Sequence, residues 1–129
     1  MPVLQATVAA QGTASTVQDL VIGEASHGGT VREVTIIPEA AVTAHGTNYR
    51  TISVLNKGQA GAGTTSVAAL PLDTPTTDDL VAFDEKTVPL SGTAANLAVV
   101  EGDVLVVAET VAGSGLAHGG YTIKVIYSA

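Results

Sequence analysis

The amino-acid sequence predicts an all-β protein, a single-domain, jelly-roll-like β-sandwich of about seven to eight strands with an extended N-terminal arm. Valine and threonine recur along the whole chain, and their branched side chains favour pleated strands. Glycine, with 14 residues, joins Asn and Asp as a turn residue between the valine-rich runs. Because 129 residues suffice for one domain, these strands are expected to pack as the two sheets of one sandwich.

The first 15 residues are expected to form the arm, and residues 16–129 the sandwich domain. Ala, Thr and Gln dominate the arm, and its only large apolar side chains are Val3, Leu4 and Val8. With so little apolar surface to bury, the arm is expected to be disordered until it binds. Val3, Leu4 and Val8 are therefore the candidate partner-binding residues of the arm, by packing on a partner surface or by adding an edge strand.

Two strands are expected after the arm. Residues 16–22 form the first and residues 31–37 the second, with a turn at residues 26–29 between them. Pro38 has no amide hydrogen to donate, so it ends the second strand or marks a sheet edge. Residues 39–42 could form a single helical turn, which is too short to be stable alone.

The middle of the chain shows the clearest alternation of side chains, in residues 49–56, which are therefore predicted to be a strand. A glycine-rich loop, residues 57–63, leads to a further strand at residues 65–72. Residues 73–79 are polar and contain three acids, so they are expected to be an exposed loop. Phe83, the only phenylalanine, is expected to anchor that loop.

The remaining residues are expected to add three strands. Residues 87–90 form a short edge strand interrupted by Pro89. Residues 104–111 and 121–127 form two longer strands, separated by a second glycine-rich loop. Alternation in four strands gives the residues expected to face inward, namely Val34, Ile36, Ile52, Val54, Leu105, Val107, Ile123 and Val125.

The charge balance argues against several classes of partner. Five basic residues stand against twelve acidic ones, which leaves a net charge of −7. A nucleic-acid binder needs clustered Lys and Arg, and an acidic surface is repelled by anionic lipid. Aromatic residues make up only 3%, so the core must be aliphatic, and burial against a partner would add to its stability.

Targeting signals and cysteine chemistry are also not indicated. No apolar run reaches the roughly 20 residues that a membrane helix needs. The N-terminus lacks the basic residues and apolar core of a signal peptide. The absence of cysteine excludes disulfides and Cys-ligated metals, and it fits assembly in a reducing cytoplasm.

No pattern points to catalysis. Residues 58–65 are similar in sequence to a phosphate-binding loop, but Thr64 stands where the lysine is needed and a strand is expected to follow. We therefore interpret them as a flexible hairpin loop. Two pairs of adjacent acids within residues 78–85 are expected to carry solvent-facing charge, not to hydrolyse sugars or hold Ca²⁺. We therefore predict no catalytic residue, no cofactor, no metal and no enzymatic activity.

The three histidines leave one alternative open. His27, His45 and His118 each precede a glycine in an expected loop. If these loops met, three imidazoles could bind Zn²⁺ or Ni²⁺. None shows the short spacing that places two ligands on one face, so three solvated loop histidines are the competing interpretation.

Turn and strand motifs distributed from Val31 to Val125 carry a resemblance to a known family. They are Thr35-Ile36-Ile37-Pro38, Gly46-Thr47-Asn48-Tyr49-Arg50-Thr51, Asn56-Lys57-Gly58 with Gly61 and Gly63-Thr64, Phe83-Asp84-Glu85-Lys86, Gly102-Asp103-Val104-Leu105 and Gly113-Ser114-Gly115-Leu116-Ala117. In these motifs the chain resembles the small β-rich head-decoration, or capsid-stabilising, proteins of tailed bacteriophages.

The resemblance implies a structural role in the virion. It implies many copies on the outer surface of the capsid, bound to the major capsid protein and commonly as homotrimers, after synthesis in the host cytoplasm. It implies no enzymatic role and assigns no catalytic residues. The arm lies outside the resemblance, and with a capsid as the partner its Val3, Leu4 and Val8 become the candidate capsid-binding residues.

A carbohydrate-binding or adhesive β-sandwich of a phage fibre is the alternative from another class. Exposed aromatic platforms would favour it, and the sequence offers only Tyr49, Tyr121 and Tyr127 for that purpose. A small-barrel metal enzyme is the third hypothesis, and it depends on the histidines.

Overall fold

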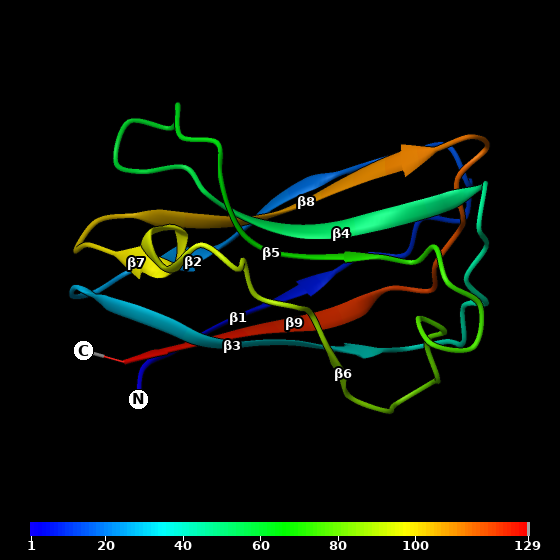
Figure 1. Ribbon diagram of the computed structural model, residues 1–129, viewed down its shortest axis with the longest axis horizontal. Helices are drawn as coiled ribbons and strands as arrows, with labels where there is room; N and C mark the ends of the chain where they lie inside the picture. Colours follow the sequence, from blue (N-terminus) through cyan, green and yellow to red (C-terminus); the bar gives the residue numbers. More distant parts are fainter. Residues whose placement is uncertain (129) are drawn as a thin grey trace.

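The computed structural model describes residues 1–128, which form two facing antiparallel sheets (Figure 1). Nine strands and one short 3₁₀ helix make up the fold. In chain order they are β1 (Val3–Val8), β2 (Asp19–Glu24), β3 (Gly29–Pro38), β4 (Tyr49–Asn56), β5 (Thr65–Pro71), β6 (Lys86–Thr87), η1 (Ala94–Leu97), β7 (Ala98–Val99), β8 (Val104–Ala112) and β9 (Tyr121–Ser128). Residues 1–128 contain no helix with the length and apolarity needed to span a membrane.

The order of the strands is that of a jelly roll. One sheet has the order β1-β9-β3-β6, with β7 also paired to β3, and the other has the order β2-β8-β4-β5. The chain passes from one sheet to the other at each connection, apart from the β4–β5 hairpin and the step from β6 to β7. This winding of two sheets confirms the predicted jelly-roll-like sandwich.

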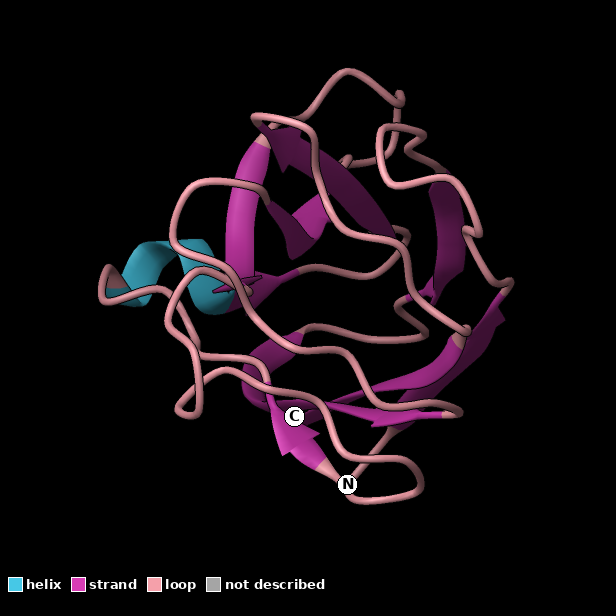
Figure 2. Cartoon of the chain, turned by 90° about the vertical axis from the view of Figure 1, so that its right-hand side faces the viewer, coloured by secondary structure: helices cyan, strands magenta, loops and turns pink. Residues whose placement is uncertain are grey.

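The core lies between the sheets, and Figure 2 shows how the strands surround it when the molecule is seen from one end. All eight residues predicted to face inward are fully buried. They belong to β3, β4, β8 and β9, the central strands. Their alternation is confirmed because a strand with one face on the core must place every second side chain inward.

The N-terminal segment differs from the expected free arm. Residues Val3–Val8 form β1, which pairs with β9 from Val3↔Ile126 to Val8↔Tyr121. Leu4, Ala6 and Val8 alternate inward and pack on the core. Leu4 also lies over Gly23 of β2, where a Cβ would stand only 3.1 Å from the Leu4 side chain. The segment is thus an edge strand that helps to close one side of the sandwich.

Smaller differences follow from long-range pairing. Residues 39–42 form no helical turn, because Val42 pairs with Leu80 in an antiparallel bridge. The strand expected at residues 16–22 begins only at Asp19. The expected edge strand at 87–90 is reduced to β6, and Leu90 instead forms an isolated bridge with Ala68.

Phe83 does not anchor its loop, since it is 79% exposed. Its backbone has a φ of 63°, in the left-handed region that residues other than glycine rarely adopt. The glycine-rich loop after β4, in contrast, is the connection of a hairpin as predicted, with β4 and β5 paired along their length.

Candidate functional site

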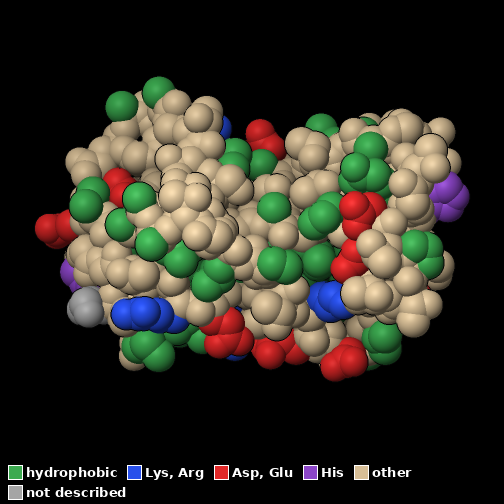
Figure 3. Space-filling view, in the orientation of Figure 1, with side chains coloured by type: hydrophobic (Ala, Val, Ile, Leu, Met, Phe, Trp, Pro, Cys, Tyr) green, Lys and Arg blue, Asp and Glu red, His purple; other side chains and the backbone are tan. Residues whose placement is uncertain are grey.

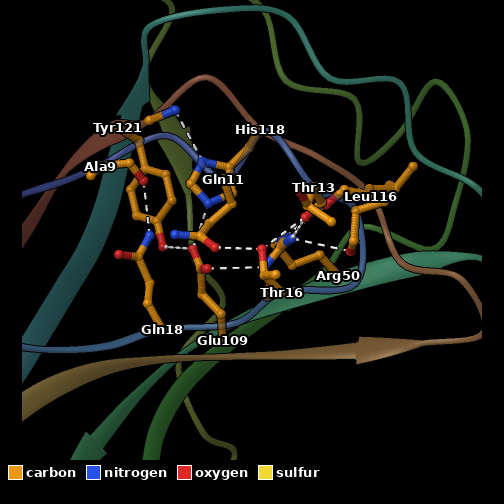
Figure 4. Close-up of polar contacts among 12 residues, drawn as sticks. Ala9, Gln11, Thr13, Thr16, Gln18, Arg50, Glu109, Leu116, His118 and Tyr121 are labelled. Carbon is orange, nitrogen blue, oxygen red and sulfur yellow. Dashed lines mark hydrogen bonds and ion pairs between the residues drawn. The ribbon is translucent and has the colours of Figure 1, made fainter.

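A buried polar cluster lies at the end of the sandwich where β4 and β9 begin (Figure 4). Its members are Arg50 from β4, Glu109 from β8, Tyr121 from β9 and His118 from the loop between β8 and β9. Arg50 Nη1 lies 3.0 Å from Glu109 Oε1, and both side chains are fully buried. The Tyr121 hydroxyl donates to Glu109 Oε2 at 2.7 Å. The carboxylate of Glu109 is therefore the centre of the cluster.

Arg50 also holds two loops through hydrogen bonds from its three nitrogens. Nε donates to the Leu116 carbonyl at 2.7 Å, and Nη1 donates to the Thr16 carbonyl at 2.6 Å. Nη2 donates to the Ala14 carbonyl at 3.2 Å. The guanidinium thus binds the loop before β2 and the loop before β9 at the same time, and its five donors suit this role.

His118 lies between a backbone amide and the Glu109 carboxylate. Its Nδ1 accepts a hydrogen bond of 3.0 Å from the Gly120 amide. Nε2 stands 2.8 Å from Glu109 Oε2, in a direction poorly aligned for a hydrogen bond. The Tyr121 ring packs on the imidazole with a centroid distance of 5.1 Å.

The cluster also fixes the protonation of its acids. Burial alone would raise the pKa of Glu109, but the contacts of His118 and Tyr121 and the charge of Arg50 outweigh it and hold that pKa below its usual value. Burial and the neighbouring Glu109 carboxylate raise the pKa of Tyr121 well above its ordinary value. Glu109 therefore stays ionised and Tyr121 stays protonated at neutral pH.

The cluster holds loops together from inside the sandwich. The side chains of Arg50, Glu109 and His118 are almost completely enclosed. The surface formed by residues 1–128 also has no pocket.

Sequence reasoning missed this cluster, although a signal was present. Arg50 is in phase with the inward residues of β4, and Glu109 is in phase with Leu105 and Val107 of β8. Two opposite charges on inward faces of neighbouring strands predict a buried ion pair. The pairing of β4 with β8 brings them together, since Ile52 lies opposite Glu109.

The three histidines lie apart. His27 packs on Tyr127, at the opposite end of β9 from His118. His45 Nδ1 accepts the Asn48 amide at 2.8 Å, which closes its own loop. Across residues 1–128, no three His, Asp or Glu side chains are grouped in a way that could hold a metal ion.

The candidate capsid-binding residues are separated by the alternation of β1. Val8 is fully buried and Leu4 packs on the core, so both are used inside the sandwich. Only Val3 is exposed among the three. Contact with a partner through this segment would have to use Val3 and its outward neighbours Gln5 and Thr7.

Comparison with known proteins gives little. No protein-family model matches the chain, and no curated protein matches it. One solved structure that is similar is described as "Structure of infectious bursal disease virus Gx strain", with 12% sequence identity and a TM-score of 0.37. The match covers 99% of this chain and 32% of that chain, so this chain spans about a third of its length. A TM-score this low does not establish a relationship between the two proteins.

Proposed function

We propose that the chain is a structural protein of a virion, which decorates the outer surface of a tailed-phage head and stabilises it against internal pressure. The proposed partners are the major capsid protein and two further copies of the chain in a homotrimer. Synthesis in the host cytoplasm belongs to the same proposal. The residue motifs that resemble head-decoration proteins support it.

The observation that carries the proposal is the jelly-roll order of the strands. Jelly rolls serve in viral capsid domains, in lectins and in cupins. Because a fold does not fix a function, the choice among such classes depends on the side chains that the fold presents.

The side chains favour the capsid class over its two rivals. A sugar-binding module needs exposed aromatic platforms, but Tyr121 and Tyr127 are buried and Tyr49 is half-buried. A small-barrel metal enzyme needs converging ligands, and the histidines lie apart. The ion-pair cluster is enclosed in the sandwich, so a partner would contact only the outer surface of the chain, as a capsid protein would.

The physical basis of stabilisation is linkage. When a protein binds only the intact shell and its free concentration is 100 times its dissociation constant, it adds about 2.7 kcal/mol per site to the stability of the shell. A trimer engages several sites at once, so modest single contacts suffice. The acidic surplus of the chain favours an outward position, away from packaged DNA.

The test compares heads of the encoding phage assembled with and without the chain. On heating, or on abrupt dilution from high salt, heads without the chain are expected to release DNA earlier. Mass spectrometry of purified particles gives the copy number relative to the shell protein, and sedimentation of the chain tests the trimer. Equal DNA release from both kinds of head would overturn the proposal.

A further inference from the structure

The only phenylalanine of the chain points into solvent from a backbone position that favours glycine. The Asp84 amide donates to the Val81 carbonyl at 3.1 Å, so residues 81–84 form a turn with Phe83 in third place. Its φ of 63° is the value that a type II turn requires there, and glycine is the residue that meets it without strain. An aromatic residue at this place costs conformational free energy, and its exposed ring recovers none of that cost within the chain.

The turn is held firmly on both sides. The Phe83 amide donates to the Pro38 carbonyl at the end of β3, at 2.8 Å. Leu80, just before the turn, is buried and exchanges two backbone hydrogen bonds with Val42. A ring presented by such a fixed turn loses little freedom on binding, which favours affinity.

Phe83 has exposed apolar neighbours and an acidic surrounding. Val81 is 58% exposed, and Ile37, next to Pro38, is 42% exposed. Residues 73–85 contain no Lys or Arg but five of the twelve acids of the chain, namely Asp73, Asp78, Asp79, Asp84 and Glu85. Figure 3 shows acidic side chains along the lower edge and over the right-hand part of the face in view, with a basic side chain among those on the right.

The nearest basic groups do not reverse this charge. Lys86 donates to the Thr77 carbonyl at 2.5 Å, and Lys124 lies 3.6 Å from Glu85 in a half-exposed pair. A second copy of the chain would bring the same acids, and one of its five basic residues, Arg50, is buried. Like charges at a contact are unfavourable, so the surface fits a basic partner and not itself.

We propose that the turn of residues 81–84 is a docking anchor, in which Phe83 enters an apolar pocket that Lys or Arg side chains of a protein partner surround. Aromatic anchors that fill a pocket inside a polar rim are typical of protein interfaces. The proposal rests on the proposed function in naming the shell protein of the phage head as that partner. It assigns the contact to the β5–β6 segment and not to β1.

The experiment measures binding of the purified chain to heads assembled without it. Phe83→Gly removes the ring and relieves the strained turn, and its affinity is expected to fall at least about 30-fold with an unchanged or raised Tm. Thr76→Gly is the matched control, because Thr76 is exposed, has a φ of 72° and lies in the same segment. Val100→Ala removes an exposed apolar side chain beyond β7. Both controls are expected to bind like the wild type, and binding is expected to weaken with salt.

The possible results distinguish a failure of the docking proposal from a failure of the proposed function. If Phe83→Gly binds like the wild type, the docking proposal is wrong while the proposed function stands. If the wild type does not bind the heads, the proposed function fails and the docking proposal fails with it. If Phe83 instead drives self-association of the free chain in sedimentation, a second copy is the occupant and the basic partner is wrong.

A second measurement covers the case in which Phe83→Gly folds poorly. Hydrogen exchange of the wild-type chain, free and bound to heads, is expected to slow in residues 81–84 on binding. Unchanged exchange there, with protection in β1 instead, would overturn the docking proposal without any variant.

Discussion

Two regions depart from the usual distribution of side chains in opposite ways. One is the end of the sandwich that holds the buried polar cluster, called the sealed end below, and the other is the segment between β5 and β6. At the sealed end, Arg50 and Glu109 carry full charges in the interior. In the β5–β6 segment, Phe83 carries the largest apolar side chain of its region in solvent. Charged residues are rarely buried unless they are paired, and large apolar residues are rarely left fully outside.

The difference shows which exception serves the fold. Each hydrogen-bonding nitrogen of Arg50 has a partner, and these partners lie on loops that the sandwich must close. Phe83 gains no comparable stabilising contacts within the fold, because its turn is strained and its ring is 79% exposed. We therefore assign the buried exception to stability and the exposed one to binding.

The largest expected effect comes from Arg50→Met. It leaves the Glu109 carboxylate buried without its cation and the Leu116 and Thr16 carbonyls without a donor, so it should cost about 3–5 kcal/mol of unfolding free energy. Urea denaturation measures it, and the double variant Arg50→Met with Glu109→Leu should recover part of the loss. A single-variant cost below about 1 kcal/mol would mean that the sealed end does not depend on its ion pair.

A smaller effect is expected from Gly115→Ala, in the loop that Arg50 binds. Gly115 has a φ of 71°, and a Cβ there would overlap the carbonyl oxygen of Ala14, which Arg50 also contacts. We expect a loss of about 2 kcal/mol, from left-handed strain and from displacement of that carbonyl. Gly12→Ala is the matched control, since a Cβ there meets nothing within 4 Å, and it should change stability by less than about 0.5 kcal/mol. Equal effects of the two changes would contradict tight packing of this loop.

The pH dependence of stability should also separate the two regions. The pKa of Glu109 is lower in the folded chain than its ordinary value of 4.5, so its ionised form stabilises the fold above that pH. This stabilisation is lost as the pH falls below 4.5 through the folded pKa, by at most about 1.4 kcal/mol per pH unit. Glu109→Gln should lack this part of the slope, because a glutamine side chain does not ionise. Parallel stability curves for the two proteins between pH 7 and acid would refute it.

The sequence was sufficient for the central strands and the sandwich class. In each of β3, β4, β8 and β9, two large aliphatic residues stand two positions apart, and this spacing places both of them on the core side of the strand. The strand β1 has the same alternation but small and polar residues, and its partner β9 lies at the other end of the chain. Such long-range pairing cannot be derived from local propensity.

The polar cluster was within reach of the sequence, and the exposed aromatic was not. Arg50 and Glu109 both stand at inward positions of strands whose phase was known. Phe83 lies in a turn fixed by hydrogen bonds to Pro38 and between Leu80 and Val42, and the local sequence does not reveal these long-range contacts. An isolated phenylalanine in a sequence is more often in a core than in solvent, so the expected anchor was the reasonable but wrong choice.

The smallest expected effect is the change in stability on Phe83→Gly, and it tests the comparison most directly. Glycine removes the left-handed strain, worth about 1–2 kcal/mol, but adds freedom to the unfolded chain that offsets about half of it. Because the ring buries little area in the chain, the net change should lie between zero and about +1 kcal/mol of unfolding free energy. Phe83→Ala keeps the strain and removes only the ring, so it should change stability by less than about 0.5 kcal/mol. Urea denaturation could instead show that both variants lose more than about 1 kcal/mol of unfolding free energy. The ring would then have to pack within the folded chain, and Phe83 would no longer be explained as an exposed anchor for a partner.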